Sequence, residues 1–377
     1  MESGKWGIWR EWRWVCGLQG FCKHLLFLSS FCFLSGDLFC AEPLQPWTFC
    51  YRRSFLEHPL TSGGRAFVKE KVHPFSQLIF SWNSFRPQRG FFRFWIRVHD
   101  TKRGWLSWHK AFEWGHVQRS FGDAHSDGSY NHVRYEMPHG RLADGFWIKI
   151  EVVGGNGGNG GNGGARLEDI VQLSVSASRL NGFQVESNTL RYSRLKPIFI
   201  RGVPIWSQMV LDHPRAPALC SPTSTCMLAS YLGKKTYSPV QFAQSVFDDG
   251  LSIFGSWQCN VALAFEKVNG RTRAQVDYLF CVQRLHSFNE LYKILARGIP
   301  VVVSVRGVLE GAPKAYPHGH LLLVVGFDPV NRMVICHDPA APSLRGVIRK
   351  YRLSGAHGFL HAWGNSNNLA YVAFKPS

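Results

Sequence analysis

The chain has 377 residues, of which 45% are hydrophobic, 14% aromatic and 18% charged, and its formal net charge is +18. This length accommodates two domains with separate cores, and the composition excludes a disordered chain. The charge favours contact with polyanions, but the basic residues are scattered and no zinc-finger, helix-turn-helix or RNP-like motif accompanies them. We therefore do not expect nucleic acid as the partner.

The amino-terminal segment resembles an export signal. Basic residues up to Lys23 precede an apolar run from Leu25 to Leu34, and small or polar residues follow. The run is too short to span a bilayer comfortably, and Phe39 is a poor residue before a cleavage site at 40 or 41. We expect residues 1–41 to be a signal peptide or an amino-terminal anchor, and the protein to be periplasmic, bound to the cell envelope or secreted.

The next part, residues 50–190, alternates apolar and polar side chains in short runs. In one run Phe92 and Phe94 fall on one face while Arg93 and Arg97 fall on the other. The pattern predicts a β-sandwich or jelly roll. Its expected strands are residues 77–82, 91–98, 145–152 and 170–175.

Two features of this part leave its ligand open. Residues 154–164 repeat Gly-Gly-Asn and cannot bury a core, so they predict a flexible loop between the third and fourth strands. A group of aromatic residues could stack on sugars or peptides, although aromatic residues in small β-domains belong more often to the core. This group comprises Trp105, Trp108, Trp114, Tyr130 and Tyr135.

Helices and strands alternate after a linking segment at 190–202, which predicts an α+β domain over residues 200–377. The first helix should run from Ser221 or Pro222 to Leu232, and a second should begin at Ser238-Pro239. A capping box, Ser287-Phe-Asn-Glu290, predicts a third helix. Strand-like apolar runs follow at 300–305, 320–327 and 333–337.

One cysteine of this domain has the surroundings of a nucleophile. Cys220 stands immediately before a helix start, where unpaired N–H groups and the helix dipole favour thiolate. His320 opens an apolar strand and can serve as the base, and Asp338 ends the next strand and can orient the imidazole. Gln208 can supply a side-chain N–H to an oxyanion beside the Cys220 amide.

The remaining candidates have simpler interpretations. Strand alternation would place His318 and His320 on one side and makes a metal pair conceivable, but no third ligand accompanies them, and we expect His318 to be a solvated loop residue. We expect neither a metal nor an organic cofactor. Asp328 is a competing acid that fits a turn better. Four further cysteines, Cys226, Cys259, Cys281 and Cys336, fit inert buried positions.

Four motifs carry a resemblance to a known family. Ala218–Gly233, with its Cys-Ser-Pro-Thr-Ser, resembles the nucleophile motif of C39-like peptidases. Phe254–Ala264 resembles the family's Gly-Asn-Trp…Asn-Val-Ala segment, Gly319–Phe327 its histidine motif, and His337–Ala341 its Asn-Asp-Pro-Ala motif. The resemblance covers about residues 200–377.

This resemblance implies a papain-like fold behind the β-sandwich. It makes Cys220 the nucleophile, His320 the base, Asp338 the orienting acid and Gln208 the oxyanion donor. The chain departs from the family pattern at two positions. Ser256 and His337 each replace a common Asn, without removing a catalytic group.

We therefore expect an exported cysteine peptidase that hydrolyses amide bonds of a peptide or cell-wall peptide. The same residues would also serve acyl transfer to an amine. A transporter-linked leader peptidase is disfavoured, because the sequence has neither a transmembrane bundle nor a P-loop. The alternatives are a catalytically silent envelope-binding protein, which uses the aromatic β-domain and the basic surface, and a surface protein held to an anionic envelope polymer by charge.

Overall fold

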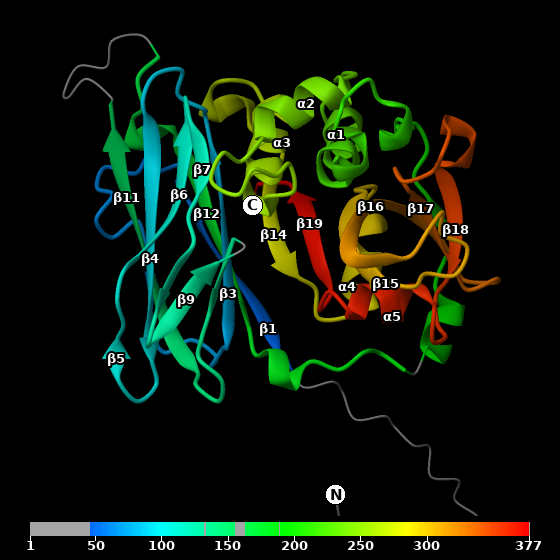
Figure 1. Ribbon diagram of the computed structural model, residues 1–377, viewed down its shortest axis with the longest axis horizontal. Helices are drawn as coiled ribbons and strands as arrows, with labels where there is room; N and C mark the ends of the chain where they lie inside the picture. The colour runs from blue at the N-terminus through cyan, green and yellow to red at the C-terminus, as the bar shows by residue number, and fades with distance from the viewer. Residues whose placement is uncertain (1–45, 132, 155–162, 188, 377) are drawn as a thin grey trace, which may run out of the picture. The chain divides into compact units, whose positions relative to one another are not determined.

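The computed structural model describes residues 46–131, 133–154, 163–187 and 189–376. The predicted signal segment, 1–41, and most of the predicted Gly/Asn-rich loop lie outside these residues. The described part is α+β, as predicted, and contains three antiparallel sheets with helices beside the third (Figure 1). None of its helices is long and apolar enough to cross a membrane.

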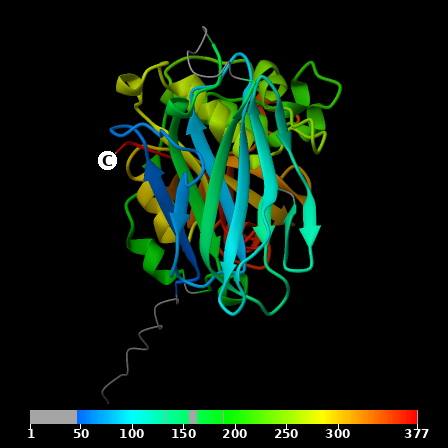
Figure 2. The same cartoon turned by 90° about the vertical axis from the view of Figure 1, so that its left-hand side faces the viewer.

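Two sheets face each other as a β-sandwich (Figure 2). All four predicted strands are present, with ends that differ by up to three residues. Along β4 the predicted inward-facing side chains are fully buried, as the alternation requires. The first sheet has the order β1 (Thr48–Ser54), β12 (Ile170–Ser178), β3 (Gln77–Ser84), β10 (Arg134–Glu136), β9 (Gly128–Asn131) and β8 (Asp123–His125). The second has the order β2 (Phe67–Lys69), β11 (Ala143–Val153), β4 (Phe91–Asp100), β6 (His109–Gly115) and β7 (Gln118–Ser120), and β5 (Gly104–Trp105) pairs with β4.

The aromatic group of the sandwich divides between its core and its surface. Trp114, Tyr130 and Tyr135 are fully buried between the sheets, which confirms the core interpretation for them. Trp105 and Trp108 are half-buried and contact Trp147 on the other side of the second sheet.

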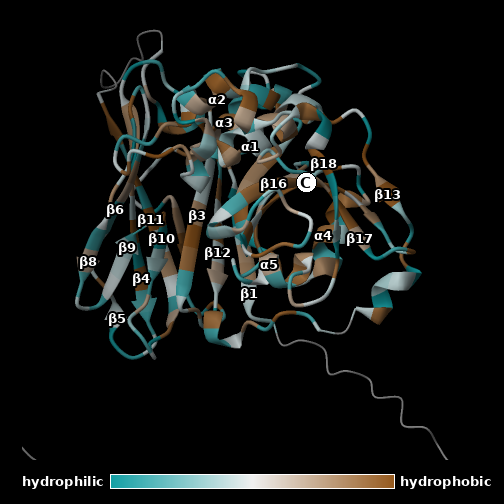
Figure 3. Ribbon diagram, turned by 45° about the vertical axis from the view of Figure 1, so that its right-hand side comes forward, coloured by the Kyte–Doolittle hydropathy of each residue, from teal (hydrophilic) through white to brown (hydrophobic). Residues whose placement is uncertain are grey.

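The third sheet carries the carboxy-terminal part of the chain, and hydrophobic residues run along much of its strand β16 (Figure 3). The strands β15, β16 and β17 pair antiparallel in sequence, as predicted. The order is β14 (Leu279–Arg284), β19 (Leu369–Phe374), β15 (Val301–Gly307), β16 (Tyr316–Asp328), β17 (Met333–His337) and β18 (Ile348–Arg352), and β13 (Ile198–Phe199) pairs with β16. The helices are α1 (Cys220–Leu232), α2 (Pro239–Val246), α3 (Trp257–Val268), α4 (Phe288–Leu295) and α5 (Phe359–Gly364). Short 3-10 helices are Leu167–Asp169, Leu180–Gly182, Leu190–Arg194, Gln208–Val210, Ala216–Ala218, Arg273–Gln275 and Leu344–Gly346.

Of the two predicted helix caps, the one at α2 forms and the one at α4 does not. Ser238 caps α2 by accepting a hydrogen bond from the Gln241 amide. The predicted capping box of α4 does not form, because the Ser287 hydroxyl makes no cap bond and Glu290 accepts from the amide of His286 instead. The Glu290 carboxylate therefore accepts from the backbone N–H of His286, one residue before Ser287, whose N–H a capping box would use.

The sandwich and the third sheet meet through polar side chains on β3 and backbone groups on β14. Asn83 donates to the Phe280 carbonyl and accepts from the Phe280 amide, both at 2.8 Å, and Ser81 accepts from the Val282 amide. This contact explains why every residue of β3 is buried, including those on the side away from the sandwich core. Residues 45–377 form one compact unit, so the boundary predicted between two domains stays a prediction.

Asn83→Ala tests this junction. The substitution leaves two buried backbone groups of Phe280 without partners, at about 1–3 kcal/mol each, so we expect the free energy of unfolding to fall by roughly 2–6 kcal/mol. Urea unfolding measures the loss. Ser84→Ala is the matched control, because the Ser84 hydroxyl is buried without a hydrogen-bond partner among the described residues. A loss no larger in Asn83→Ala than in the control would contradict the account.

Candidate active site

The thiol of the site stands at the start of α1. Cys220 is the first residue of this helix and is half-buried, whereas Ser221 and the following nine residues are buried. The helix is attached to β16 by a hydrogen bond of 3.0 Å from the Ser224 hydroxyl to the Leu321 carbonyl. Because Leu321 follows His320, this bond fixes the thiol relative to the imidazole.

The imidazole of the site lies on β16. His320 is 4% exposed, and its Nε2 lies 2.8 Å from Asp338 Oδ1. The other ring nitrogen, Nδ1, is therefore the atom available to the thiol. Tyr316 stacks on the imidazole, with ring centroids 4.1 Å apart and an angle of 14° between the planes. The ring is thus held both by a carboxylate and by an aromatic face.

The carboxylate of the site is buried and fully hydrogen-bonded. Asp338 is 0% exposed and, besides His320, accepts from the hydroxyls of Tyr316 at 2.7 Å and Tyr351 at 2.6 Å and from the Ala340 amide at 2.9 Å. Burial alone would raise the pKa of Asp338, but His320 and the two hydroxyls lower it to about 2. The carboxylate stays ionised at neutral pH.

Charge separation between thiol and imidazole follows from this arrangement. Burial lowers the pKa of His320, yet Asp338 and the thiol outweigh burial and raise it to about 9. Burial raises the pKa of Cys220, and the interaction with His320 together with the backbone of Leu321 and Ser221 lowers it below its ordinary value. Both shifts favour a thiolate beside an imidazolium.

Gln208 lies beside the nucleophile segment but its amide faces that segment's backbone. Its Nε2 donates to the carbonyls of Ala216 at 3.1 Å and Pro217 at 2.8 Å, and its buried Oε1 has no partner among the described residues. Reversing the amide would place its oxygen against two carbonyl oxygens, so this orientation is the favourable one. One N–H must turn away from these carbonyls before it can reach an oxyanion.

The two departures from the family pattern have structural roles. Ser256 is buried at the start of α3, and its hydroxyl donates to Asp248, which also accepts from the Ser120 amide of the sandwich at 2.9 Å. His337 lies 3.1 Å, through Nδ1, from the Pro204 carbonyl, and burial lowers its pKa. Ser256 therefore helps join the sandwich to the segment between α2 and α3, and His337 holds the segment that leads to Gln208.

Sequence reasoning missed Tyr316 and Tyr351. Tyr316 precedes His320 by four residues on β16, and Tyr351 lies on β18, which was not predicted. For Tyr316 the only available signal was its position four residues before a histidine of the same strand, and Tyr351 had none. The two tyrosine hydroxyls can be assigned to Asp338 only once the pairing of β16, β17 and β18 is known.

Two competing candidates are resolved by the structure. His318 is exposed, which confirms the prediction of a solvated residue, although it lies within β16 and not in a loop. His320, two residues later, is buried. The physical reason for this difference is Gly319, whose φ of 93° interrupts the extended backbone between them. Asp328 accepts hydrogen bonds from the amide and side chain of Asn331, which confirms its place in a turn.

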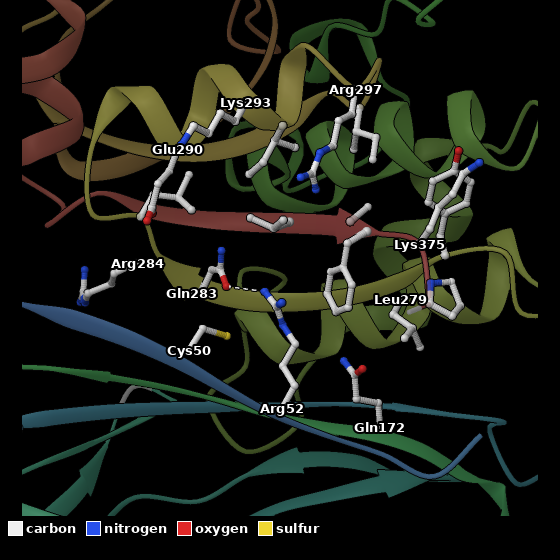
Figure 4. Close-up of a pocket in the computed structure, with 18 of the residues that line it drawn as sticks. Cys50, Arg52, Gln172, Leu279, Gln283, Arg284, Glu290, Lys293, Arg297 and Lys375 are labelled. Carbon is white, nitrogen blue, oxygen red and sulfur yellow. Dashed lines mark hydrogen bonds between the residues drawn. The ribbon is translucent and has the colours of Figure 1, made fainter. Parts of the chain in front are cut away.

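A separate pocket of about 960 Å³ lies beside β1, β14 and α4, and none of the four predicted site residues lines it (Figure 4). Cys50 lines the pocket, and Cys281 beside it is buried, as predicted. The Cys281 Sγ lies 3.9 Å from Arg52 Nη2, and a hydrogen bond with Cys50 lowers the pKa of Cys281 to about 7 against the effect of burial. Of the charged side chains around the pocket, one is acidic and five are basic: Glu290 against Arg52, Arg284, Lys293, Arg297 and Lys375.

The fold and these residues define a class: an α+β protein with a papain-like domain, in which a helix-start thiol, an imidazole and a buried carboxylate come together. Residues 200–371 match the model of the Peptidase_C39 like family. One solved structure, described as a candidate C39-like peptidase from Bacillus anthracis, is 19% identical and covers 48% of this chain and all of its own, with a TM-score of 0.35. No curated protein matches the chain.

Tyr351→Phe tests how the carboxylate is held. The wild-type Asp338 pKa of about 2 lies below its ordinary 3.8, so its contribution to stability is complete above about pH 4 and is lost as pH falls through 2. At pH 7 the variant should lose roughly 1.5–3 kcal/mol, because a bond to a charged group is removed. That difference should narrow toward pH 2, where Asp338 becomes protonated.

Urea unfolding between pH 2 and pH 7 measures this difference. Tyr292→Phe is the control, since its hydroxyl bonds to the exposed backbone of Lys196. A deficit in Tyr351→Phe that is constant over the whole pH range would contradict the assignment of its hydroxyl to the carboxylate.

Proposed function

We propose that the protein is an exported cysteine peptidase that hydrolyses amide bonds with Cys220, His320 and Asp338. The observation that supports this most is the convergence of the three groups from α1, β16 and the end of β17, with the pKa of the thiol lowered and that of the imidazole raised. The match of residues 200–371 to a peptidase family supports the same chemistry. Peptides or cell-wall peptides are the proposed substrates.

In the proposed reaction the Cys220 thiolate attacks the amide carbon and forms a tetrahedral intermediate. The backbone N–H of Cys220 and one N–H of Gln208 stabilise its oxyanion, after the Gln208 amide turns from the Pro217 carbonyl. The C–N bond breaks as imidazolium gives its proton to the leaving amine. His320 then removes a proton from water, which attacks the thioester and releases the acid and the thiolate.

Peptide turnover tests the proposal. The wild type should cleave members of a mixed peptide library and of a set of cell-wall peptides, with new amino termini identified by mass spectrometry, while Cys220→Ala should cleave none. Gln208→Ala should lower kcat by roughly 10²–10³ with little change in KM, because the lost donor acts on the transition state.

Cys226→Ala is the matched control, because this buried cysteine lies on the same helix and its pKa is raised to about 12 by burial. Its activity should be retained. Cleavage by Cys220→Ala at the wild-type rate would overturn the proposed nucleophile.

A second candidate function, envelope binding without catalysis, is favoured by one surface of the sandwich. Arg97 lies over three half-buried rings, 4.9 Å from Trp105, 4.7 Å from Trp108 and 4.3 Å from Trp147. Indole rings beside a cation are suited to stacking on sugars and to contact with acidic groups. We call Arg97, Trp105, Trp108 and Trp147 the indole platform. In a peptidase this platform would attach the enzyme to the envelope, and in a protein with an inert Cys220 envelope binding would be its only function.

Trp147→Ala tests this platform. If it binds glycans, retention on insoluble peptidoglycan should fall several-fold in Trp147→Ala and stay unchanged in Cys220→Ala. Phe199→Ala is the control, because Phe199 is an exposed aromatic residue outside the platform. Equal retention of Trp147→Ala and the wild type in a co-sedimentation assay would exclude the platform as the binding surface.

A further inference from the structure

A cluster of two histidines and an aspartate lies on the sandwich, away from the proposed catalytic residues. His109 comes from β6, and Asp123 and His125 come from β8. Each offers one nitrogen or oxygen atom, and these atoms all lie within 4.8 Å of one another. His125 Nε2 is 3.1 Å from Asp123 Oδ2, and His109 Nδ1 is 3.4 Å from the same oxygen. The alternation of β8 explains the pair, because residues two apart share a face of a strand.

The buried member of the cluster is the unusual one. His109 is 0% exposed, and neither of its ring nitrogens has a hydrogen-bond partner among the described residues. The 3.4 Å contact of its Nδ1 with Asp123 does not have the geometry of a hydrogen bond. A buried polar group without a partner costs about 1–3 kcal/mol, so the fold retains an imidazole here at a loss unless something binds it.

A further carboxylate lies close to the cluster. Asp127 follows in the turn after β8 and interacts electrostatically with His109. Its Oδ2 accepts from the Ser107 amide at 3.1 Å, and its Oδ1 is buried with no partner among the described residues. His109 nitrogens and an Asp127 oxygen without hydrogen-bond partners therefore lie near one another. Asp123 and His125 are partly exposed, so solvent can reach the cluster.

We propose that His109, Asp123 and His125 bind a divalent transition-metal ion of the zinc type. Two imidazoles and one carboxylate are a donor set that Zn²⁺ prefers, whereas Ca²⁺ and Mg²⁺ prefer sites made of oxygen. The three donor atoms lie within 4.8 Å of one another, and each must lie about 2.0–2.2 Å from a bound Zn²⁺. The pair of donor atoms that lies farthest apart must therefore approach by about 1 Å. His125 and Asp123 are partly exposed and can make this movement.

The place of the site in the sandwich gives the ion a structural consequence. His109 belongs to the sheet that contains β4 and β11, and β8 is the last strand of the opposite sheet. A bound ion would therefore join the two sheets at an edge strand that is only three residues long and pairs with β9 alone. Binding to the folded form alone raises stability in proportion to the logarithm of the metal concentration above the Kd.

Zn²⁺ titration of the full chain tests the proposal. Chelator-treated protein should bind one Zn²⁺ per chain at this site, measured by competition with a chromophoric chelator, and its Tm should rise with added Zn²⁺ but not with Mg²⁺. His125→Ala and Asp123→Asn alter partly exposed groups, so both should fold and should bind this ion roughly tenfold or more weakly. His139→Ala, an exposed histidine of the same sandwich, is the matched control and should bind as the wild type does.

Thiols are the competing ligands for the ion. Cys220→Ala should keep the ion if the proposal holds, and Co²⁺ in the site should show no thiolate-to-metal charge-transfer band. Equal Zn²⁺ binding by His125→Ala, Asp123→Asn and the wild type would assign the ion to other ligands and overturn the proposal, as would the absence of stoichiometric binding. Either result would leave the proposed peptidase activity unaffected.

Discussion

The ionised carboxylate of Asp338, held without solvent by four hydrogen bonds, is the interaction on which the rest of the site depends. It accepts from an imidazole, two tyrosine hydroxyls and a backbone amide, and these donors come from β16, β18 and the loop after β17. A buried charge without these donors would be neutralised by protonation. The same charge raises the pKa of His320, and His320 in turn lowers that of Cys220. The carboxylate thus acts on the sulfur through the imidazole, without contacting it.

The backbone frame makes this chain of interactions possible. The α1 helix is buried along nearly its whole length and is attached to β16 one residue beyond His320. The backbone N–H of Gln208 donates to the Pro339 carbonyl at 2.8 Å, so the segment before the nucleophile is attached to the loop that carries Asp338. The sandwich supports the other side, through β3 against β14 and through Ser120 against Asp248. Small shifts at the junction would therefore reach the site through packed elements.

The sequence could predict the groups of the site better than their surroundings. Cys220 begins a helix, His320 lies in an apolar strand and Asp338 directly follows one, and these positions were indicated by local pattern. Tyr351 could not be assigned, because its donation depends on how β17 and β18 pair. The exposure of His318 was predicted, but its place within β16 was not. Period-2 reasoning by itself would have put it on the side of His320, because it assumes an extended backbone and Gly319 departs from it.

The sandwich shows the same limit. The strands were predictable from alternation, but the burial of both sides of β3 comes from contacts with β14, about 200 residues later in the sequence. His109 and His125 gave no sequence signal as a pair, since they lie on strands of opposite sheets. The predicted oxyanion role of Gln208 stays a prediction, because the side chain lies in the expected region while its amide is bonded to two carbonyls.

The pH dependence of iodoacetamide labelling at Cys220, in the wild type and in His320→Ala, tests the central claim most directly. The labelled site must be identified by mass spectrometry, because Cys50 is also only partly buried. The account predicts fast labelling of Cys220 at about pH 6–7 that collapses in His320→Ala, since the imidazolium stabilises the thiolate. Slow labelling in both proteins, with an apparent pKa near the free-thiol value of about 8.5, would contradict it.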